Sequence, residues 1–432
     1  MFTQKEKDIV RSLACRVADL SALPVMEERK LLWKNKNALR DARPAVLTFP
    51  EGAWHELLPA GILRCESLPA REMEWKLRAR IYRYEHFYDD FVVEPVYNVY
   101  RAVQSTGFGL EPEFIKRGDP KRTLWDIDDT LGCVPRVWDP AFQFNSKSWH
   151  YGSVLKDWED VEKIVPPVIS EDTAESLRRM DSARELLGDT LELRAVGVNR
   201  VSLIPFNFYT KLRGLEQSMF DAYDHPDLMH AAMRRLTDAL ESMVRQYEAL
   251  GLLSLNNDGS YVGSGGVGYT DELPSPGFSG KASRRDLWAN AESQETSSMS
   301  PDFHAEFVFP YERELIGGFG LTAYGCCEPL DAKFATLATC TNLRRVSISP
   351  WANVAVCSEQ AGKRYVFSYK PNPALLASGY DPQHVEQSMR TNLALCRDNC
   401  TEVILKDTHT CENRPERFEH WGKTVRKIVE NL

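Results

Sequence analysis

The chain has 432 residues, of which 43% are hydrophobic and 27% charged, and a formal net charge of -9. This composition is typical of a globular protein, and no window reaches the about 18 uninterrupted apolar residues of a membrane-spanning helix. The acidic balance, without a long basic stretch, argues against a nucleic-acid backbone as partner. Small molecules and other proteins remain as partners.

Cysteine usage and the N-terminus both favour the cytoplasm. The ten cysteines are scattered without a compact framework, as expected for reduced thiols in a chain of this length. The first residues are charged and lead directly into an amphipathic pattern, so no export signal is indicated. We expect one large cytoplasmic domain with an N-terminal extension, and the sequence leaves open whether it forms a homodimer.

The first part of the chain, residues 1–89, is predicted to be a helical extension. Helical spacing of apolar residues runs through residues 3–40, with Thr3 as a cap, and through residues 72–86. Residues 45–49 form a short β-prone run between them. Residues 91–100 have strand composition and are predicted as the first strand of the main domain, residues 90–432. Residues 105–155 suggest irregular hairpins, with arms at 124–131 and 134–138.

From residue 172 onward, helical and β-prone segments alternate, which indicates a parallel sheet and favours a (β/α)8 TIM barrel. The second strand of that barrel is ambiguous. The predicted helices lie at 172–187, 214–223, 226–250, 329–338, 352–361 and 381–399. The predicted strands lie at 200–206, 252–256, 321–326, 344–349, 365–370 and 402–407.

A stretch rich in Gly, Ser and Pro spans residues 256–305. Because it follows a predicted strand, it is expected to be a lid loop over the carboxyl ends of the strands. The glycines at 263–268 could cradle a phosphate, but no Lys-Ser/Thr pair ends the run and no helix clearly follows it.

The segment Leu321-Thr-Ala-Tyr-Gly-Cys-Cys-Glu-Pro-Leu330 combines a strand pattern with metal-ligating side chains. Alternation along a strand places Cys326 and Glu328 on one face, where a thiolate and a carboxylate suit zinc. The alternative is that the cysteines are small buried hydrophobes. The last predicted strand ends in His409-Thr-Cys411, and strand ends converge in a barrel, so His409 or Cys411 could complete the site. In the alternative without a metal, His409 caps a loop and Cys411 is inert.

The sequence resembles the uroporphyrinogen decarboxylase superfamily, in particular its branch of corrinoid-dependent methyltransferases, from about residue 91 to the end. The segments that carry the resemblance are Gly197-Val-Asn-Arg-Val-Ser-Leu-Ile-Pro-Phe206, Leu321 to Leu330, Val346-Ser-Ile-Ser-Pro-Trp351, Tyr365-Val-Phe-Ser-Tyr-Lys-Pro-Asn-Pro373 and Ile404-Leu-Lys-Asp-Thr-His-Thr-Cys411. Zinc methyltransferases of that branch carry a His-x-Cys after the fifth strand and a further Cys near the end of the eighth. Here Cys326 stands in place of that His and Glu328 in place of that Cys.

The resemblance implies methyl transfer from a small methylated substrate, such as a methoxyaromatic compound or methylated amine, to the Co(I) of a corrinoid on a partner protein. Zinc would assist by coordinating the leaving atom. The ligand set would be Cys326, Glu328 and either His409 or Cys411, with Glu328 also catalytic.

Side chains near the strand ends are candidates for the substrate pocket, although the aromatic ones could equally be packing residues. These candidates are Tyr97, Asn98, Phe206, Asn207, Tyr324, Trp351, Lys370 and Asn372. Lys406 and Asp407 are candidate catalytic residues, because neighbours on a strand face opposite sides and one of the two charges must therefore point inward.

Two alternatives to methyl transfer remain at this point. The chain could be a metal-independent decarboxylase acting on another carboxylated substrate, although it lacks the Arg-Gln-Ala-Gly-Arg stretch with which true decarboxylases of the superfamily grip carboxylates. It could also be a non-enzymatic barrel that binds a small molecule or an assembly partner.

Overall fold

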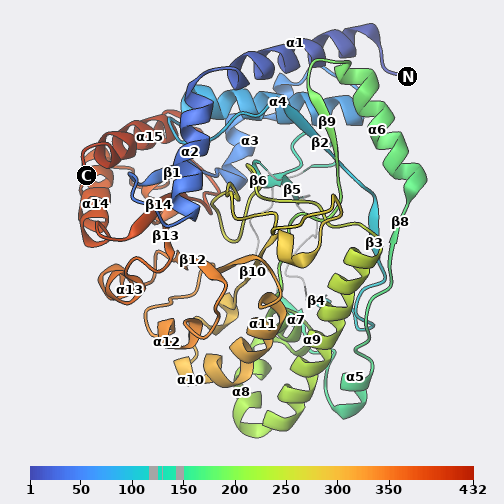
Figure 1. Cartoon of the computed structure of the whole chain (residues 1–432), viewed down its shortest axis with the longest axis vertical. Coiled ribbons are helices and arrows are strands. Elements are labelled where there is room, and N and C mark those ends of the chain that lie inside the picture. Colours follow the sequence, from blue (N-terminus) through green and yellow to red (C-terminus); the bar gives the residue numbers. More distant parts are fainter. Residues whose placement is uncertain (116–124, 129, 143–149) are drawn as a thin grey trace.

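The centre of the molecule is a six-stranded parallel sheet (Figure 1). The computed structural model describes residues 1–115, 125–128, 130–142 and 150–432. The strand order is β1-β14-β13-β12-β11-β10, with every neighbouring pair parallel. These strands are β1 (Ala45–Thr48), β10 (Trp288–Ala291), β11 (Leu321–Tyr324), β12 (Leu343–Ile348), β13 (Val366–Tyr369) and β14 (Cys400–Leu405).

Continuous burial explains why these short segments form a parallel sheet. All residues of β13 and β14 are buried, as are those of β1, β10 and β11. Strands of parallel sheets are covered on both faces and therefore read as unbroken apolar runs rather than alternating ones. The predicted strands at 321–326, 344–349, 365–370 and 402–407 are confirmed with shifts of one or two residues at their ends.

A second parallel pair joins β2 (Val96–Tyr100) to β9 (Glu192–Val196). Two isolated parallel bridges follow β9 in the sequence. Val198 pairs with Leu253, and Ser202 pairs with Asn290 of β10. The predicted strands at 200–206 and 252–256 are therefore reduced to isolated bridges. Across the described residues the strands form a mixed α/β arrangement with a six-stranded sheet, and a closed ring of backbone pairing is not present.

Three small antiparallel pairs lie outside the main sheet. They are β3 (Val103–Ser105) with β8 (Ile169–Glu171), β4 (Glu113–Ile115) with β7 (His150–Gly152), and β5 (Trp125–Asp128) with β6 (Gly132–Pro135). The hairpin predicted within 105–155 is present as β5 and β6. Residues 116–124, 129 and 143–149, which include part of the first predicted arm, lie outside the described residues.

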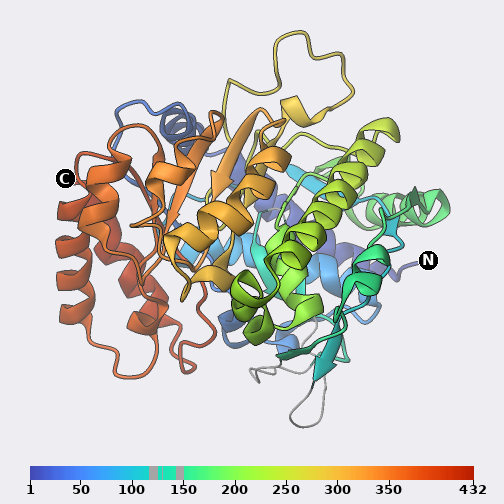
Figure 2. The same cartoon turned by 90° about the horizontal axis from the view of Figure 1, so that it is seen from below.

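Helices surround the sheet (Figures 1 and 2). The α-helices are α1 (Gln4–Ser21), α2 (Val25–Asn37), α3 (Trp54–Leu57), α4 (Leu68–His86), α5 (Trp158–Glu162), α6 (Thr173–Leu187), α7 (Pro205–Arg213), α8 (Leu215–Asp224), α9 (Pro226–Ala249), α10 (Pro301–Phe303), α11 (Phe309–Ile316), α12 (Phe334–Leu337), α13 (Val354–Ala361), α14 (Pro382–Leu395) and α15 (Glu416–Val429). Short 3-10 turns are η1 (Glu51–Ala53), η2 (Ala60–Ile62), η3 (Arg284–Asp286), η4 (Gln294–Thr296) and η6 (Pro373–Leu376), and η5 (His304–Val308) is a π-helix.

The predicted N-terminal extension contributes a strand to the sheet, so it is not purely helical. β1 pairs in register with β14, from Ala45 opposite Glu402 to Thr48 opposite Leu405. The predicted first strand, 91–100, is shorter and begins at Val96. Thr3 caps α1 as expected, since its side chain accepts from the backbone N–H of Glu6 and the Glu6 carboxylate accepts in return.

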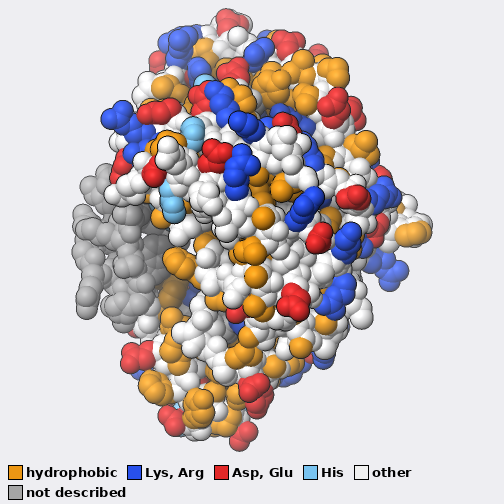
Figure 3. All heavy atoms as spheres, turned by 90° about the vertical axis from the view of Figure 1, so that its left-hand side faces the viewer, with side chains coloured by type: hydrophobic (Ala, Val, Ile, Leu, Met, Phe, Trp, Pro, Cys, Tyr) orange, Lys and Arg blue, Asp and Glu red, His pale blue; other side chains and the backbone are white. Residues whose placement is uncertain are grey.

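The predicted lid loop at 256–305 is interrupted by a sheet strand. β10 lies in its second half and is buried between β11 and the segment around Ser202. Sequence analysis missed this strand because Trp-Ala-Asn-Ala has little β-branched content. The face that carries α13 to α15 shows basic and acidic side chains mixed together rather than in one-sign stripes (Figure 3). Within the described residues, no helix is long and apolar enough to cross a bilayer.

Candidate active site at the carboxyl ends of the sheet

Acidic and thiol side chains gather where β10 and β11 end. Glu292 directly follows β10, and Cys326, Cys327 and Glu328 follow β11. Because β10 and β11 are parallel neighbours, their carboxyl ends open at the same edge of the sheet. This edge is the place where parallel α/β sheets usually bind ligands.

Glu328 is fully buried and is held by two backbone amides. The N–H of Ser293 donates to its Oε1 and the N–H of Cys326 donates to its Oε2, each at 2.9 Å. These bonds tie the turn after β10 to the turn after β11. Each carboxylate oxygen accepts one backbone hydrogen bond in this way, so Glu328 fixes the position of Cys326.

Glu292 is a buried carboxyl group of the site whose surroundings favour the protonated form. Burial raises its pKa well above the ordinary value, and the neighbouring Cys326, Glu328 and Glu295 raise it further. Its Oε2 atom is buried and has no hydrogen-bond partner among the described residues. A buried, protonated carboxylic acid beside a thiol is suited to give a proton to a bound ligand.

Cys326 and Cys327 form a thiol pair with a Sγ–Sγ distance of 3.6 Å. The Ser264 hydroxyl donates to Cys326 Sγ at 3.2 Å. Interaction with Cys327 and burial raise the pKa of Cys326, whereas the hydrogen bond from Cys326 lowers the pKa of Cys327. The thiolate of this pair therefore forms preferentially on Cys327.

Lys406 reaches the same place from β14. Its Nζ donates to Ser264 Oγ at 3.4 Å, so Ser264 joins Lys406 to Cys326. The ammonium lies 3.3 Å from Asp407 Oδ1 and 3.6 Å from Glu51 Oε1. Burial works against the charged ammonium, but Tyr261, Glu51 and Asp407 outweigh it and raise the pKa of Lys406 well above its ordinary value.

Glu51 and Asp407 hold the ammonium from two turns of unusual backbone. Both residues have left-handed φ values, 48° for Glu51 and 59° for Asp407. Such values are uncommon in residues other than glycine and cluster at functional sites. Burial raises the pKa of Glu51 to about 7, although Lys406 acts in the opposite direction.

Other predicted pocket residues lie at varying distances from this cluster. Asn207 donates its amide N–H to Glu295, whose own pKa is raised by burial. Lys370 is buried and donates to Ser347, and burial lowers its pKa to about 8. Lys370 and Asn372 line a separate pocket of about 290 Å³ between the ends of β12 and β13 and helix α14. Asn372 Oδ1 also accepts from the backbone N–H of Ala374 at 2.9 Å, which caps η6.

Tyr324 lies behind the site in a buried polar network. Its hydroxyl donates to Glu312 Oε2 at 2.6 Å and contacts His304 Nε2 at 2.7 Å and Ser293 Oγ at 3.1 Å. Burial, with Lys333 nearby, lowers the pKa of His304 to about 3, so the imidazole is neutral. Tyr324 is buried, and its hydroxyl supports the turn after β10 through the contact with Ser293 Oγ.

The remaining predicted pocket residues are structural or exposed. Tyr97 is buried with the Arg80 guanidinium 5.6 Å from its ring centroid, and burial raises its pKa. Asn98 is half-buried in β2, and Phe206 packs in a helical core with Phe303 and Tyr209. Trp351 is 70% exposed and therefore does not line a closed pocket.

The residues proposed as zinc ligands do not form a common metal site in the described part of the chain. Cys411 is buried, and its thiol donates to Glu56 Oε2 at 3.0 Å, which with burial raises its pKa to about 12. His409 is exposed and lies against Gly52. Among the residues that the structure describes, no group of three or more His, Cys, Asp or Glu side chains could hold a metal ion. The residues do not fit the implied zinc, and no chemical step is assigned to it.

No family model matches the sequence, and no curated protein matches it. Among solved structures, a methyltransferase from Methanosarcina mazei aligns with a TM-score of 0.46 and 9% sequence identity, over 92% of this chain and 98% of that chain. We base neither the fold nor the activity on a similarity this low.

Sequence reasoning missed Glu292, Glu295, Glu51 and Ser264. Glu292 and Glu295 follow β10, which lay inside the predicted lid loop. Glu51 follows β1, which lay inside the predicted extension. The available signal was an acidic residue shortly after a short strand. For Glu292 and Glu295 the strand itself was not predicted, and for Glu51 the β-prone run at 45–49 was assigned to the extension. Ser264 was visible only as part of the glycine-rich run.

Proposed function

We propose that the chain is a methyltransferase that moves a methyl group from a small methylated substrate, a methoxyaromatic compound or a methylated amine. The acceptor would be the Co(I) of a corrinoid carried by a separate protein, as the sequence resemblance suggests. The observation that carries the proposal is Glu292, a buried acid whose Oε2 has no partner among the described residues and whose raised pKa favours the protonated form.

Methyl transfer from oxygen or nitrogen is slow because the leaving alkoxide, phenolate or amine is poor. The bond between the methyl carbon and the leaving atom breaks, and its electron pair stays on that atom. A proton from Glu292 to the same atom neutralises the developing charge, an effect that general acids typically supply with about 10²- to 10⁴-fold rate enhancement. In this proposal the acid takes the place that the resemblance gives to zinc.

Besides the acid Glu292, the site contains the ammonium group of Lys406. Lys406 is buried and lies one hydroxyl away from Cys326 through Ser264. A fixed ammonium in a dry site stabilises negative charge on a bound substrate. We propose that Lys406 orients an anionic or phenolic substrate while Glu292 faces the leaving atom.

The proposed fold is a (β/α)8 barrel whose ring is completed by segments with only single bridges. The parallel β2–β9 pair and the isolated parallel bridges at Val198 and Ser202 support this proposal. Glycine and proline in residues 197–205 explain the sparse pairing there, because they interrupt regular strand backbone. The sequence-based prediction of a domain from 90 to 432 then needs β1 added to it.

The activity is tested with free cob(I)alamin as methyl acceptor and a panel of methoxyaromatic compounds and methylated amines. Loss of Co(I) absorbance together with appearance of the demethylated product is the expected result for the wild type. Glu292→Gln keeps the shape of the side chain but not its proton, so kcat is expected to fall about 10²- to 10⁴-fold. The exposed Glu359→Gln is the matched control and should be unaffected.

Elemental analysis of the purified protein tests the implied zinc separately. Stoichiometric zinc that is lost in Cys326→Ala would restore a metal-assisted mechanism. Full methyl transfer by Glu292→Gln would remove Glu292 from the reaction.

Decarboxylation is the second candidate, because a buried ammonium and a protonated acid also suit that reaction. Lys406 would bind the substrate carboxylate region, and Glu292 would protonate the carbanion left when CO2 departs. Release of CO2 from a carboxylated substrate without any corrinoid would establish this candidate and exclude methyl transfer as the main activity.

A further inference from the structure

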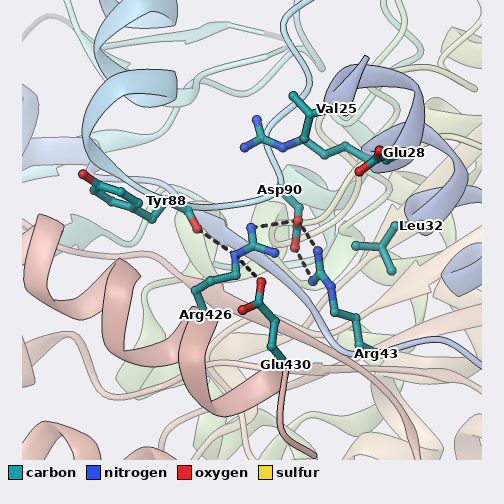
Figure 4. A pocket seen from close by; sticks show the side chains of 9 residues that line it. Val25, Glu28, Leu32, Arg43, Tyr88, Asp90, Arg426 and Glu430 are labelled. Carbon is teal, nitrogen blue, oxygen red and sulfur yellow. Dashed lines mark hydrogen bonds and ion pairs between the residues drawn. The ribbon is translucent and has the colours of Figure 1, made fainter. Parts of the chain in front are cut away.

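A second pocket, of about 480 Å³, lies where the N-terminal helices meet the last helix (Figure 4). Its volume is within the range of about 300–1,000 Å³ that is typical of small-molecule sites. Asp90 at its centre accepts from the backbone N–H of Val46 at 2.9 Å, and Val46 is the second residue of β1. The pocket therefore lies at the amino end of β1, away from the candidate active site at the carboxyl ends.

Two guanidinium groups converge on one buried carboxylate in this pocket. Arg43 Nη2 lies 2.7 Å from Asp90 Oδ1, and Arg426 Nη2 lies 2.8 Å from the same oxygen. Figure 4 shows both arginines pointing at Asp90 from opposite sides. The Asp90 side chain is 1% exposed. The buried carboxylate of Asp90 is therefore shared by two guanidinium groups.

Arg29 adds a third guanidinium. Its Nη1 donates to the backbone carbonyl of Phe91 at 2.6 Å, and no carboxylate lies within ion-pair distance of it in the part of the chain that the structure describes. Arg29 is only half exposed. Burial lowers the pKa of Arg29, and Asp89 and Asp90 only partly offset this effect. Guanidinium donors without a carboxylate partner are the usual means of binding phosphate or carboxylate.

We propose that this pocket binds a small organic dianion of the phosphate monoester class. Arg29, Arg43 and Arg426 would bind the anionic group, and Val25 and Leu32 of α2 offer an apolar wall for its carbon part. The pocket joins α2 to α15, so an anion bound there links the two ends of the chain.

Two exposed glutamates at the edge of the pocket favour small ligands over extended polyanions. Glu28 and Glu430 line the pocket and are exposed, and Glu430 Oε1 lies 3.8 Å from Arg426 Nε. These carboxylates weaken the positive potential outside the pocket, so a polyanion that stays at the surface gains little. A compact dianion that reaches the guanidinium groups gains the full interaction.

The alternative role for these arginines is structural, as ion pairs that hold α15 against the N-terminal segment. The two roles differ in their response to added anion. A purely structural network is already complete and gains nothing specific from phosphate, whereas a binding site is stabilised in proportion to its occupancy.

The test is thermal unfolding of the full chain in increasing inorganic phosphate and, in parallel, phenyl phosphate, against potassium chloride of equal ionic strength. For the wild type we expect Tm to rise and saturate, with phenyl phosphate saturating at lower concentration because it also contacts the apolar wall. Equal half-saturation of the two probes would show that the anionic group alone is bound and would overturn the ester assignment. A rise without saturation would reflect general salting-out and would overturn the site itself.

Arg29→Met retains the apolar stem and removes the charge, and it is expected to raise the half-saturating phosphate concentration at least 10-fold. Arg16→Met is the matched control, since Arg16 is 52% exposed and pairs with Glu85 elsewhere on the surface. An unchanged phosphate response in Arg29→Met would overturn the proposal.

Glu430→Gln provides a test that does not depend on the folding of an arginine variant. Glu430 is 52% exposed, and its removal leaves Arg426 paired only with Asp90. The half-saturating phosphate concentration is therefore expected to fall several-fold. An unchanged or higher value would show that Arg426 does not contact the anion and would contradict the proposed site.

Discussion

Two neighbouring glutamates illustrate how surroundings divide the roles of identical side chains. Glu328 accepts from two backbone N–H groups, which fix its position between the turns after β10 and β11. Glu292 lacks such donors on Oε2 and has acidic neighbours, so its pKa is raised. A buried carboxyl group with a raised pKa is typical of acid–base sites. The proton donor that we propose for this site is thus the glutamate that sequence reasoning did not select.

Glu51 gives a prediction about pH and stability. Its pKa is raised by burial from 4.5 to about 7. Below pH 4.5 the group is protonated in both the folded and the unfolded state. As the pH rises through about 7, the folded state has to ionise a buried carboxyl, and the free energy of unfolding falls by up to about 3 kcal/mol. In Glu51→Gln this component of the pH dependence is expected to disappear.

Urea unfolding at pH 5 and pH 8 measures the effect. Stability relative to wild type should be higher for Glu51→Gln at pH 8 than at pH 5. The exposed Glu359→Gln serves as control and should follow the wild type at both pH values. If Glu51→Gln keeps the wild-type slope, Glu51 ionises normally in the folded protein.

At the scale of elements, the glycine-rich run at 263–268 allows the loop to pack closely against β14. A Cβ on Gly265 would lie 2.5 Å from Ile404 Cγ2, and one on Gly266 would lie 2.8 Å from Glu402 Oε1. Both glycines have left-handed φ values, 108° and 100°. The run therefore lies directly against β14, which brings Ser264 between Cys326 and Lys406. Phosphate cradling, the weaker alternative in the sequence, is not needed to explain these glycines.

Under this loop, a buried ion pair connects β12 to β14. Arg345 Nε lies 3.0 Å from Glu402 Oε1, with side-chain exposures of 2% and 0%. Arg345→Met would leave Glu402 buried without its cation, and we expect a loss of about 3–5 kcal/mol in the free energy of unfolding. The double variant Arg345→Met/Glu402→Leu should recover most of that loss, because it removes both charges. Chemical denaturation of the two variants provides the measurement.

Arg344 is the matched control for this pair. It is adjacent on β12 and therefore faces the other side of the sheet, where it pairs with Glu272, which is 45% exposed. Arg344→Met is expected to cost about 1 kcal/mol or less, as exposed ion pairs usually do. Equal losses for Arg344→Met and Arg345→Met would contradict a special role for the buried pair.

At the scale of the whole molecule, the two ends of the chain form one structure. β1, from the first 50 residues, pairs with β14, from the last 33. The apolar core includes Trp54 and Trp75 from the N-terminal segment together with Trp421 from α15. Figure 1 shows α1, α2 and α4 at one end of the molecule, with α15 beside them.

Deletion of residues 1–89 tests whether the N-terminal segment is a separable extension. The truncated chain would lose β1 and expose the backbone edge of β14, so we expect it to be insoluble or to lack a cooperative unfolding transition. Solubility and thermal unfolding of the truncated chain give the answer. A cooperative transition near that of the full chain would show that residues 90–432 fold alone.

Local sequence patterns were sufficient to predict most of the helices and strands and part of the site. Unbroken apolar runs fixed the strands around residues 323, 346, 367 and 403, and helical spacing fixed the long helices such as α1 and α9. The pattern of polar residues after strands also selected Cys326 and Lys406, which Ser264 joins in the folded protein. These features depend on neighbours in the sequence, so local periodicity is sufficient to find them.

Which residues share the site depends on contacts between segments that are distant in the sequence. Cys411 could equally have met Cys326, but its thiol and backbone N–H both donate to Glu56, 355 positions earlier in the sequence. Left-handed φ values at Asp407, Glu412 and Asn413 turn the chain after β14. Glu51 and Glu292 entered the site because β1 and β10 joined the sheet by long-range pairing. Such pairing is a property of distant segments, and no local pattern specifies it.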